Sequence, residues 1–152
     1  MKKLTKTLLL SAIAVAIPTL AVLADDVKEI TLTTAKVQFI YDKKEFTVKA
    51  GEKVKIILVN PEGSVQPHNI LIVKPGKKDA VGALANTGLS DPAFLKNPVP
   101  ESEDVLFASK LAQPGTKETL EFTVPDEPGD YVYMCTFPGH WILMNGIMKV
   151  EK

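Results

Sequence analysis

Short apolar or alternating runs, separated by Gly, Pro, Asn and Asp, follow one another along the chain from Ile30 to its end. Such runs are typical of β-strands, whose successive side chains point to opposite faces of a sheet. The first two flank Asp42-Lys43-Lys44, where we expect a hairpin. The pattern contains no heptads or repeats and predicts an all-β domain, an eight-stranded Greek-key β-sandwich of antiparallel strands. The predicted strands are residues 37–41, 45–48, 54–60, 68–74, 105–111, 116–124, 130–135 and 146–150.

One stretch, residues 77–97, does not follow this rhythm. It is rich in Ala, Leu and Gly and contains Asp91-Pro92, a pair that favours the start of a short helix. We therefore expect one or two short helices, forming a flap inserted between strands of the sandwich.

The N-terminal 24 residues have the three parts of a secretory signal peptide. A basic start is followed by an apolar run over residues 8–17 and by Val22-Leu23-Ala24, a cleavage site of small residues. An uncleaved membrane anchor is the alternative, but the run is short for a membrane span and Pro18 interrupts it. We expect residues 1–24 to be a signal peptide and residues 25–152 to be one domain, soluble in the periplasm after cleavage and without stable membrane insertion.

Charge argues against nucleic acid as a partner. All 18 basic residues are Lys and three of them lie in residues 1–24, so 15 Lys remain against 18 Asp and Glu, a formal charge of −3. Phosphate binding needs a basic surface and favours the bidentate guanidinium of Arg, which this sequence lacks.

Cys135 is the single cysteine of the chain. It has no partner for a disulfide within the chain, and a free thiol is a liability in an oxidising compartment. An exported protein with one Cys therefore needs another reason to keep it, and metal binding would supply one.

A constellation near the C-terminus supplies candidate metal ligands. Cys135, His140 and Met144 have the spacing C-x4-H-x3-M and lie between the last two predicted strands. A loop can bring three side chains to one point, which a strand cannot do because its side chains alternate between faces. His68, far upstream, is the only other His. Each of the four residues alone would more often be ordinary core, but their common spacing and context favour a metal site.

Copper fits this set of ligands better than zinc. One thiolate, two imidazoles and a weak axial thioether form the ligand set of electron-transfer copper sites. Structural zinc sites usually have four Cys or His ligands, and a Met is a poor substitute for the fourth.

The segment resembles the copper-binding loop of azurins and auracyanins within the cupredoxin family. Cys135-Thr136-Phe137-Pro138-Gly139-His140 matches the azurin-type loop nearly residue for residue, and Pro67-His68-Asn69 resembles the upstream ligand site. The resemblance implies one type 1 copper ion, held at one end of the sandwich by His68, Cys135, His140 and Met144. Azurins usually have Gly before the first His. Because Pro67 stands there in this chain, as in plastocyanin-like proteins, we expect four ligands.

The resemblance also implies roles for neighbouring residues. The backbone amides of Asn69 and Phe137 would donate to the thiolate, and Asn69 and Thr136 would hydrogen-bond to each other. His140 would reach the surface through an apolar patch that includes Ile142 and Leu143. Trp141 is expected to pack in the core, and Tyr133 resembles the corner tyrosine of sandwich folds.

These features predict an electron shuttle that cycles between Cu(II) and Cu(I), and not an enzyme. A copper oxidase or nitrite reductase domain would need a further copper site built from additional His, and the sequence has none to spare. Copper transport without electron transfer is the alternative, although transport would favour Met-rich or His-rich tracts. The implied partners are redox proteins, such as c-type cytochromes, oxidases or reductases, that meet a monomer at the patch around His140.

Overall fold

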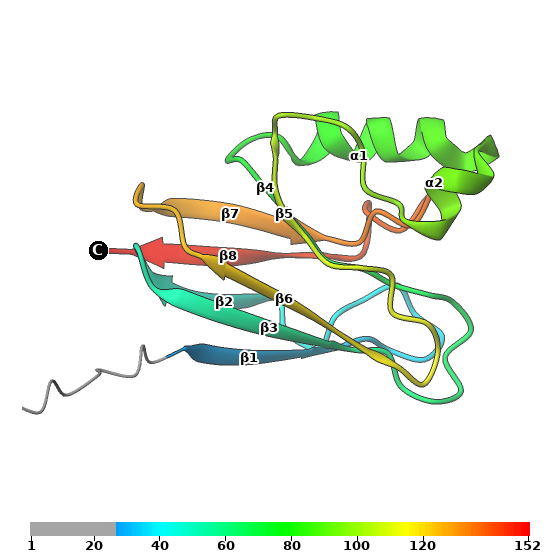
Figure 1. Ribbon diagram of the computed structural model, residues 1–152, viewed down its shortest axis with the longest axis horizontal. Helices are drawn as coiled ribbons and strands as arrows, with labels where there is room; N and C mark the ends of the chain where they lie inside the picture. Colours follow the sequence, from blue (N-terminus) through cyan, green and yellow to red (C-terminus); the bar gives the residue numbers. More distant parts are fainter. Residues whose placement is uncertain (1–26) are drawn as a thin grey trace, which may run out of the picture.

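The computed structural model describes residues 27–152, which form two packed β-sheets (Figure 1). The smaller sheet has the order β1-β3-β6 and the larger has the order β2-β8-β7-β4-β5. The predicted all-β sandwich of eight strands with a helical insertion is confirmed. The strands are β1 (Lys28–Thr33), β2 (Glu45–Lys49), β3 (Lys53–Val59), β4 (Leu71–Val73), β5 (Val105–Ala108), β6 (Lys117–Thr123), β7 (Gly129–Met134) and β8 (Asn145–Glu151).

The core lies between the two sheets and follows the alternation read from the sequence. In β3, Val54, Ile56 and Leu58 are buried while the residues between them are more exposed. In β8, Met148 and Val150 are buried in the same way and belong to the same core cluster. Alternation therefore fixes which face of each strand points inward.

The predicted hairpin around Asp42-Lys43-Lys44 is wrong. β2 pairs in parallel with β8, and residues 37–41 form no strand, with only a single bridge between Thr34 and Tyr41. Tyr41 of this segment is buried in the core, and its hydroxyl donates to the carbonyl of Asn69 at 2.6 Å. The apolar run thus packs beneath one end of the sandwich and does not extend a sheet.

β1 was not among the predicted strands, and its pairing also departs from an all-antiparallel sheet. It runs parallel to β3, with Ile30 and Leu32 directed into the core. Its first residues are Lys28 and Glu29, and its burial alternates over only two apolar positions, so the sequence signal is weak.

The helical insertion consists of α1 (Lys78–Thr87), the 3-10 turn η1 (Gly88–Ser90) and α2 (Pro92–Lys96). The side chain of Asp91 caps α2 by accepting from the amide of Ala93 at 2.8 Å. Val81 of α1 packs against a second apolar cluster with Leu71, Val73 and Met134, on β4 and β7. α1 therefore covers the outer face of the larger sheet (Figure 1).

The corner tyrosine is Tyr131, not Tyr133. Tyr131 stands near the start of β7, and its hydroxyl donates to the carbonyl of Glu127, four residues upstream, at 2.8 Å. The hydroxyl of Tyr133 instead donates across the fold to the carbonyl of Lys43 at 2.8 Å. Tyr131 and Tyr133 lie two positions apart on the same strand, and only their distance from its start distinguishes the two roles.

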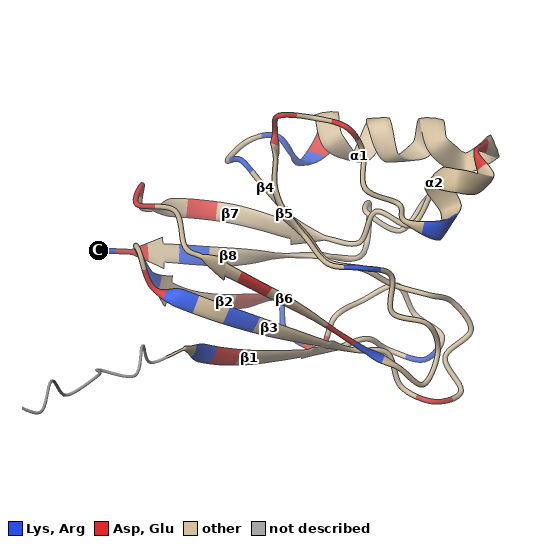
Figure 2. Ribbon diagram, in the orientation of Figure 1, with Lys and Arg blue, Asp and Glu red and all other residues tan. Residues whose placement is uncertain are grey.

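Figure 2 shows charged positions along the strands of the smaller sheet, near the C-terminus and around the helical insertion. The loop between β7 and β8 contains no Lys, Asp or Glu from Cys135 to Met144. The predicted signal peptide, residues 1–24, lies outside the described residues. Among residues 27–152, no helix is long and apolar enough to cross a membrane.

Candidate metal centre

The loop that connects β7 to β8 is folded tightly by its own backbone. The amide of Cys135, just after β7, donates to the carbonyl of Met144 at 3.0 Å, so the two ends of the loop are paired. The amide of His140 donates to the carbonyl of Phe137 at 3.0 Å, and the amide of Met144 donates to the carbonyl of His140 at 2.8 Å. Gly139 has a φ of +84°, which a residue with a side chain rarely adopts. These bonds turn the side chains of Cys135 and His140 to the same side.

His68 joins this loop from a separate part of the chain. Its backbone forms two hydrogen bonds with Ala112. The amide of His68 donates to the carbonyl of Ala112 at 3.0 Å, and the amide of Ala112 donates to the carbonyl of His68 at 2.7 Å. Its Nδ1 lies 3.8 Å from Cys135 Sγ, and Nδ1 of His140 lies 3.5 Å from the same sulfur. One ligand atom from each of the three residues lies within 4.8 Å of the others, and all three residues are buried.

Met144 is fully buried in the same apolar cluster as Cys135. Its backbone is hydrogen-bonded to both Cys135 and His140, which holds the residue at the base of the loop. The structure therefore brings His68, Cys135 and His140 together and positions Met144 beside them, while the ligand role of all four residues stays a prediction.

Burial favours the neutral forms of the side chains in the cluster. Desolvation lowers the pKa of His68 to about 4, with a smaller contribution from His140, and lowers the pKa of His140 to about 4. The two imidazoles are therefore neutral at pH 7, which is the form that binds a metal. Burial also raises the pKa of the Cys135 thiol to about 12, while the backbone amides of Asn69 and Phe137 act in the opposite direction. The direction of this effect is the one expected of amides that donate to the sulfur.

Asn69 ties the upstream segment to the loop, as predicted. Its Nδ2 donates to Thr136 Oγ1 at 2.9 Å, and its Oδ1 accepts from the amide of Thr136 at 2.9 Å. Thr136 in turn donates its hydroxyl proton to the carbonyl of Pro98, at the end of the helical insertion. Asn69 and Thr136 are fully buried, so three segments of the chain meet in one satisfied polar network.

Phe39 is a member of the site that the sequence did not reveal. Its ring stacks on the imidazole of His140, with ring centroids 4.1 Å apart and planes at 19°. Phe39 lies in the segment that was predicted to be a hairpin strand, and no motif marks it. Partly because of this ring, His140 is only 4% exposed, against 1% for His68, so the expected difference in exposure between the two is small.

The chemistry of the donors fits copper. Two neutral imidazoles and one sulfur converge in an apolar environment, and Met144 is buried in the same apolar cluster as Cys135. A buried thiolate needs a cation close to it, because burial alone keeps the thiol protonated. A soft ligand set of this kind suits copper.

Residues 28–151 match the family described as copper binding proteins, plastocyanin/azurin family. The chain belongs to this family. Its cofactor is a type 1 copper ion, and the chain is a blue copper electron-transfer protein of the azurin and auracyanin type.

Individual members of the plastocyanin/azurin family show how far the likeness extends. Auracyanin-A of Chloroflexus aurantiacus is 40% identical over 112 residues, which cover 73% of this chain and 67% of that protein. Azurin-1 of Alcaligenes xylosoxydans xylosoxydans is 33% identical over 118 residues, covering 72% of this chain and 88% of azurin-1. The structure of auracyanin A, titled a "blue" copper protein, superposes with a TM-score of 0.72 at 36% identity and covers 83% of this chain and all of that one.

Proposed function

We propose that His68, Cys135, His140 and Met144 hold the copper ion, and that the protein shuttles single electrons between redox proteins in the periplasm. The observation that carries the proposal is the buried convergence of His68, Cys135 and His140, with ligand atoms within 4.8 Å of one another. Met144 would be the fourth residue to hold the ion, by its spacing in the loop and its burial in the same apolar cluster as Cys135. Pro67 in the place of the azurin Gly supports four ligands and no fifth.

When bound, copper supplies a one-electron couple between Cu(II) and Cu(I). The protein holds the four side chains in place through bonds that do not involve the metal, namely the backbone pairs within the loop and the network between Asn69 and Thr136. Ligands fixed in this way move little when the electron arrives or leaves, which keeps the barrier to electron transfer low. The amides of Asn69 and Phe137 stabilise the negative charge on the sulfur of Cys135.

The electron is proposed to pass through His140, which is buried under Phe39 and is followed in the chain by exposed apolar side chains. Ile142 and Leu143 are 58% and 64% exposed, and Val37 and Val65 are 71% and 61% exposed. Val37 is two residues from Phe39, and Val65 donates its amide to the carbonyl of Lys36 at 3.0 Å, so these residues border the same end. Such a surface suits brief encounters with c-type cytochromes, oxidases or reductases, in which fast dissociation matters more than affinity.

Electron carriage without catalysis is the favoured activity. Copper oxidases and nitrite reductases need a second copper site built from further His, and both His residues of this chain belong to one cluster.

Residues 1–24 are proposed to be a signal peptide and residues 25–152 the copper-binding domain, which acts as a monomer. The mass of the protein recovered from the periplasm tests the cleavage, because removal of residues 1–24 leaves Asp25 as the first residue.

Stopped-flow mixing with a reduced c-type cytochrome tests the shuttle. The copper-loaded protein is expected to oxidise one cytochrome per copper. Leu143→Asp should slow the reaction by placing a charge in the apolar surface, with the visible spectrum retained, whereas Thr119→Asp adds the same charge on the outer face of β6 and should not. A protein with a normal blue spectrum that does not oxidise the cytochrome would instead support copper binding or transport without electron transfer.

A further inference from the structure

The helix α1 contacts the copper-binding loop on both sides of His140. Oδ1 of Asn86 accepts from the amide of Gly139 at 3.2 Å and from Nε1 of Trp141 at 3.3 Å. Gly139 and Trp141 are the two neighbours of His140 in the chain. A single side chain of the helical insertion thus holds the backbone before His140 and the side chain after it.

Gly82 brings the same helix directly against the Trp141 indole. A methyl group added at Gly82 would overlap the indole ring, although the backbone of Gly82 is ordinary helix that any residue adopts. Gly within a helix costs about 1 kcal/mol relative to Ala. The absence of a side chain at this position is therefore explained by the close approach of Trp141.

The residues of α1 that face the loop are spaced by four and form one stripe. Lys78 Nζ lies 5.7 Å from the centre of the Trp141 ring, Gly82 contacts the ring and Asn86 binds its nitrogen. Positions i, i+4 and i+8 lie on one side of a helix. The stripe borders the side of α1 where Val81 and Ala85 are buried, and Gly82 itself is buried, so α1 contacts the sheet and the loop with adjacent faces.

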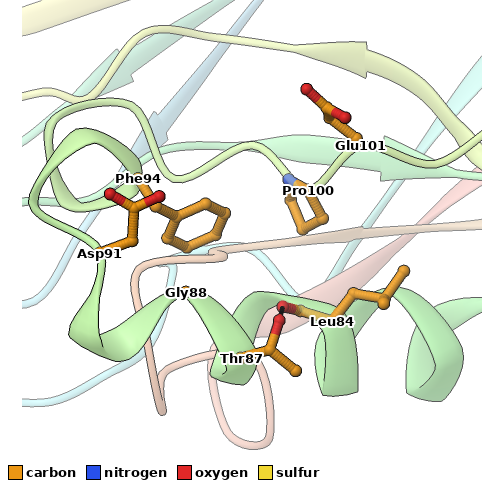
Figure 3. A pocket seen from close by; sticks show the side chains of 7 residues that line it. All are labelled: Leu84, Thr87, Gly88, Asp91, Phe94, Pro100 and Glu101. Carbon is orange, nitrogen blue, oxygen red and sulfur yellow. Dashed lines mark hydrogen bonds between the residues drawn. The ribbon is translucent and has the colours of Figure 1, made fainter.

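The remaining side of α1 is held by the rest of the insertion. A hollow of about 300 Å³ lies between α1, α2 and the segment Pro100-Glu101 (Figure 3). Its Thr87 hydroxyl donates to the carbonyl of Leu84 within α1, and the ring of Phe94 packs over Gly88. α1 is therefore supported by the sheet on one side, and Phe94 of α2 packs on η1, the turn that follows α1.

We propose that Asn86, Gly82 and Trp141 are positioning residues, through which the helical insertion fixes the loop that carries His140 and keeps its imidazole in place during electron transfer. This inference rests on the proposed role of His140 as a copper ligand. The two hydrogen bonds of Asn86 are worth about 1 kcal/mol each. Their loss should therefore loosen the loop without unfolding the domain, since the Asn86 side chain is exposed.

Asn86→Ala tests the proposal with two readouts. In the copper-free protein, the Gly139 amide and the Trp141 indole N–H should exchange with solvent about fivefold faster, the change expected from one lost bond. In the copper-loaded protein, the electron self-exchange rate should fall by up to about tenfold, a change of about 1.4 kcal/mol in activation free energy, and the electron paramagnetic spectrum should change. Asn86→Asp retains an acceptor and should restore slow hydrogen exchange. Thr87→Ala, whose hydroxyl bonds only within α1, is the control.

Gly82→Ala provides a second, independent variant. The added methyl group must displace the Trp141 indole. A positioning role predicts the same spectral change as Asn86→Ala, whereas an indole that only packs against α1 would move without altering the copper centre. The inference is overturned if hydrogen exchange at Gly139 does not change in Asn86→Ala. It is also overturned if exchange accelerates while self-exchange and spectrum stay as in the unmodified protein. Absence of a blue spectrum in the unmodified protein would instead contradict the proposed function.

Discussion

The ring of Phe39 lies nearly flat on the imidazole of His140, with centroids 4.1 Å apart, although 101 positions separate the two residues in the chain. The stack covers a candidate copper ligand with an apolar side chain from the segment after β1. Removing the ring would admit water to the site. Water stabilises the more highly charged state of a centre, and the oxidised copper site carries one more positive charge than the reduced site.

Phe39→Ala is therefore expected to lower the reduction potential while the blue colour remains. Cyclic voltammetry of the copper-loaded protein measures the shift. Val37→Ala is the matched control, because Val37 lies close in sequence but is 71% exposed. Equal potentials for Phe39→Ala and the unmodified protein would contradict the role of the stack.

Met144→Leu tests the axial ligand. Leu fills nearly the same volume, and such exchanges usually cost less than about 1.5 kcal/mol of stability. Loss of the thioether, whose electrons favour Cu(II), should raise the reduction potential, with the visible band retained. Met148→Leu is the control, since Met148 is also fully buried in the same core. The axial role is wrong if both variants have the same potential, or if Met144→Leu loses its colour altogether.

Asn69→Ala should destabilise the domain by about 2–4 kcal/mol in urea unfolding of the copper-free protein. The substitution leaves the buried amide of Thr136 without its acceptor and removes the donor to its hydroxyl, and each unsatisfied buried group costs about 1–3 kcal/mol. Asn97→Ala, at an exposed position after α2, should change stability little. A cost no larger than that of the control would show that the network does not join the segments.

Tyr41 should make the domain sensitive to alkaline pH. Burial raises the pKa of Tyr41 well above 10, with smaller contributions from Cys135 and Tyr133. The unfolded chain therefore releases its Tyr41 proton near pH 10 while the folded protein keeps it, so stability is full below pH 10 and is lost as the pH rises above it. Tyr41→Phe should reduce this dependence between pH 10 and pH 12, measured by urea unfolding, and should cost about 1 kcal/mol at pH 7 by leaving the Asn69 carbonyl without a donor. Identical pH profiles of stability for Tyr41→Phe and the unmodified protein would show that Tyr41 does not cause the sensitivity to alkaline pH.

The sequence predicts the parts of this molecule that depend on local pattern. The sequence predicts Cys135, His140 and Met144 as a group because of their spacing, and the structure has all three in the one short loop between β7 and β8. The inserted helices follow from the composition of residues 77–97 and from Asp91, which caps α2.

Contacts between segments that lie far apart in the chain could not be predicted from the sequence. β2 pairs with β8, more than 90 positions away in the chain. The alternation of apolar and polar residues does not show which strand is the partner. The stack of Phe39 on His140 and the bonds of Asn86 to the loop likewise depend on how the chain folds back on itself. None of these contacts leaves a motif in the sequence.

The visible and electron paramagnetic spectra of the purified protein after addition of Cu(II) test the central claim most directly. A thiolate of Cys135 bound to copper with two imidazoles predicts an intense charge-transfer band and a small copper hyperfine splitting, both abolished in Cys135→Ser. A pale protein with the large splitting of ordinary square-planar Cu(II), unchanged in Cys135→Ser, would contradict it.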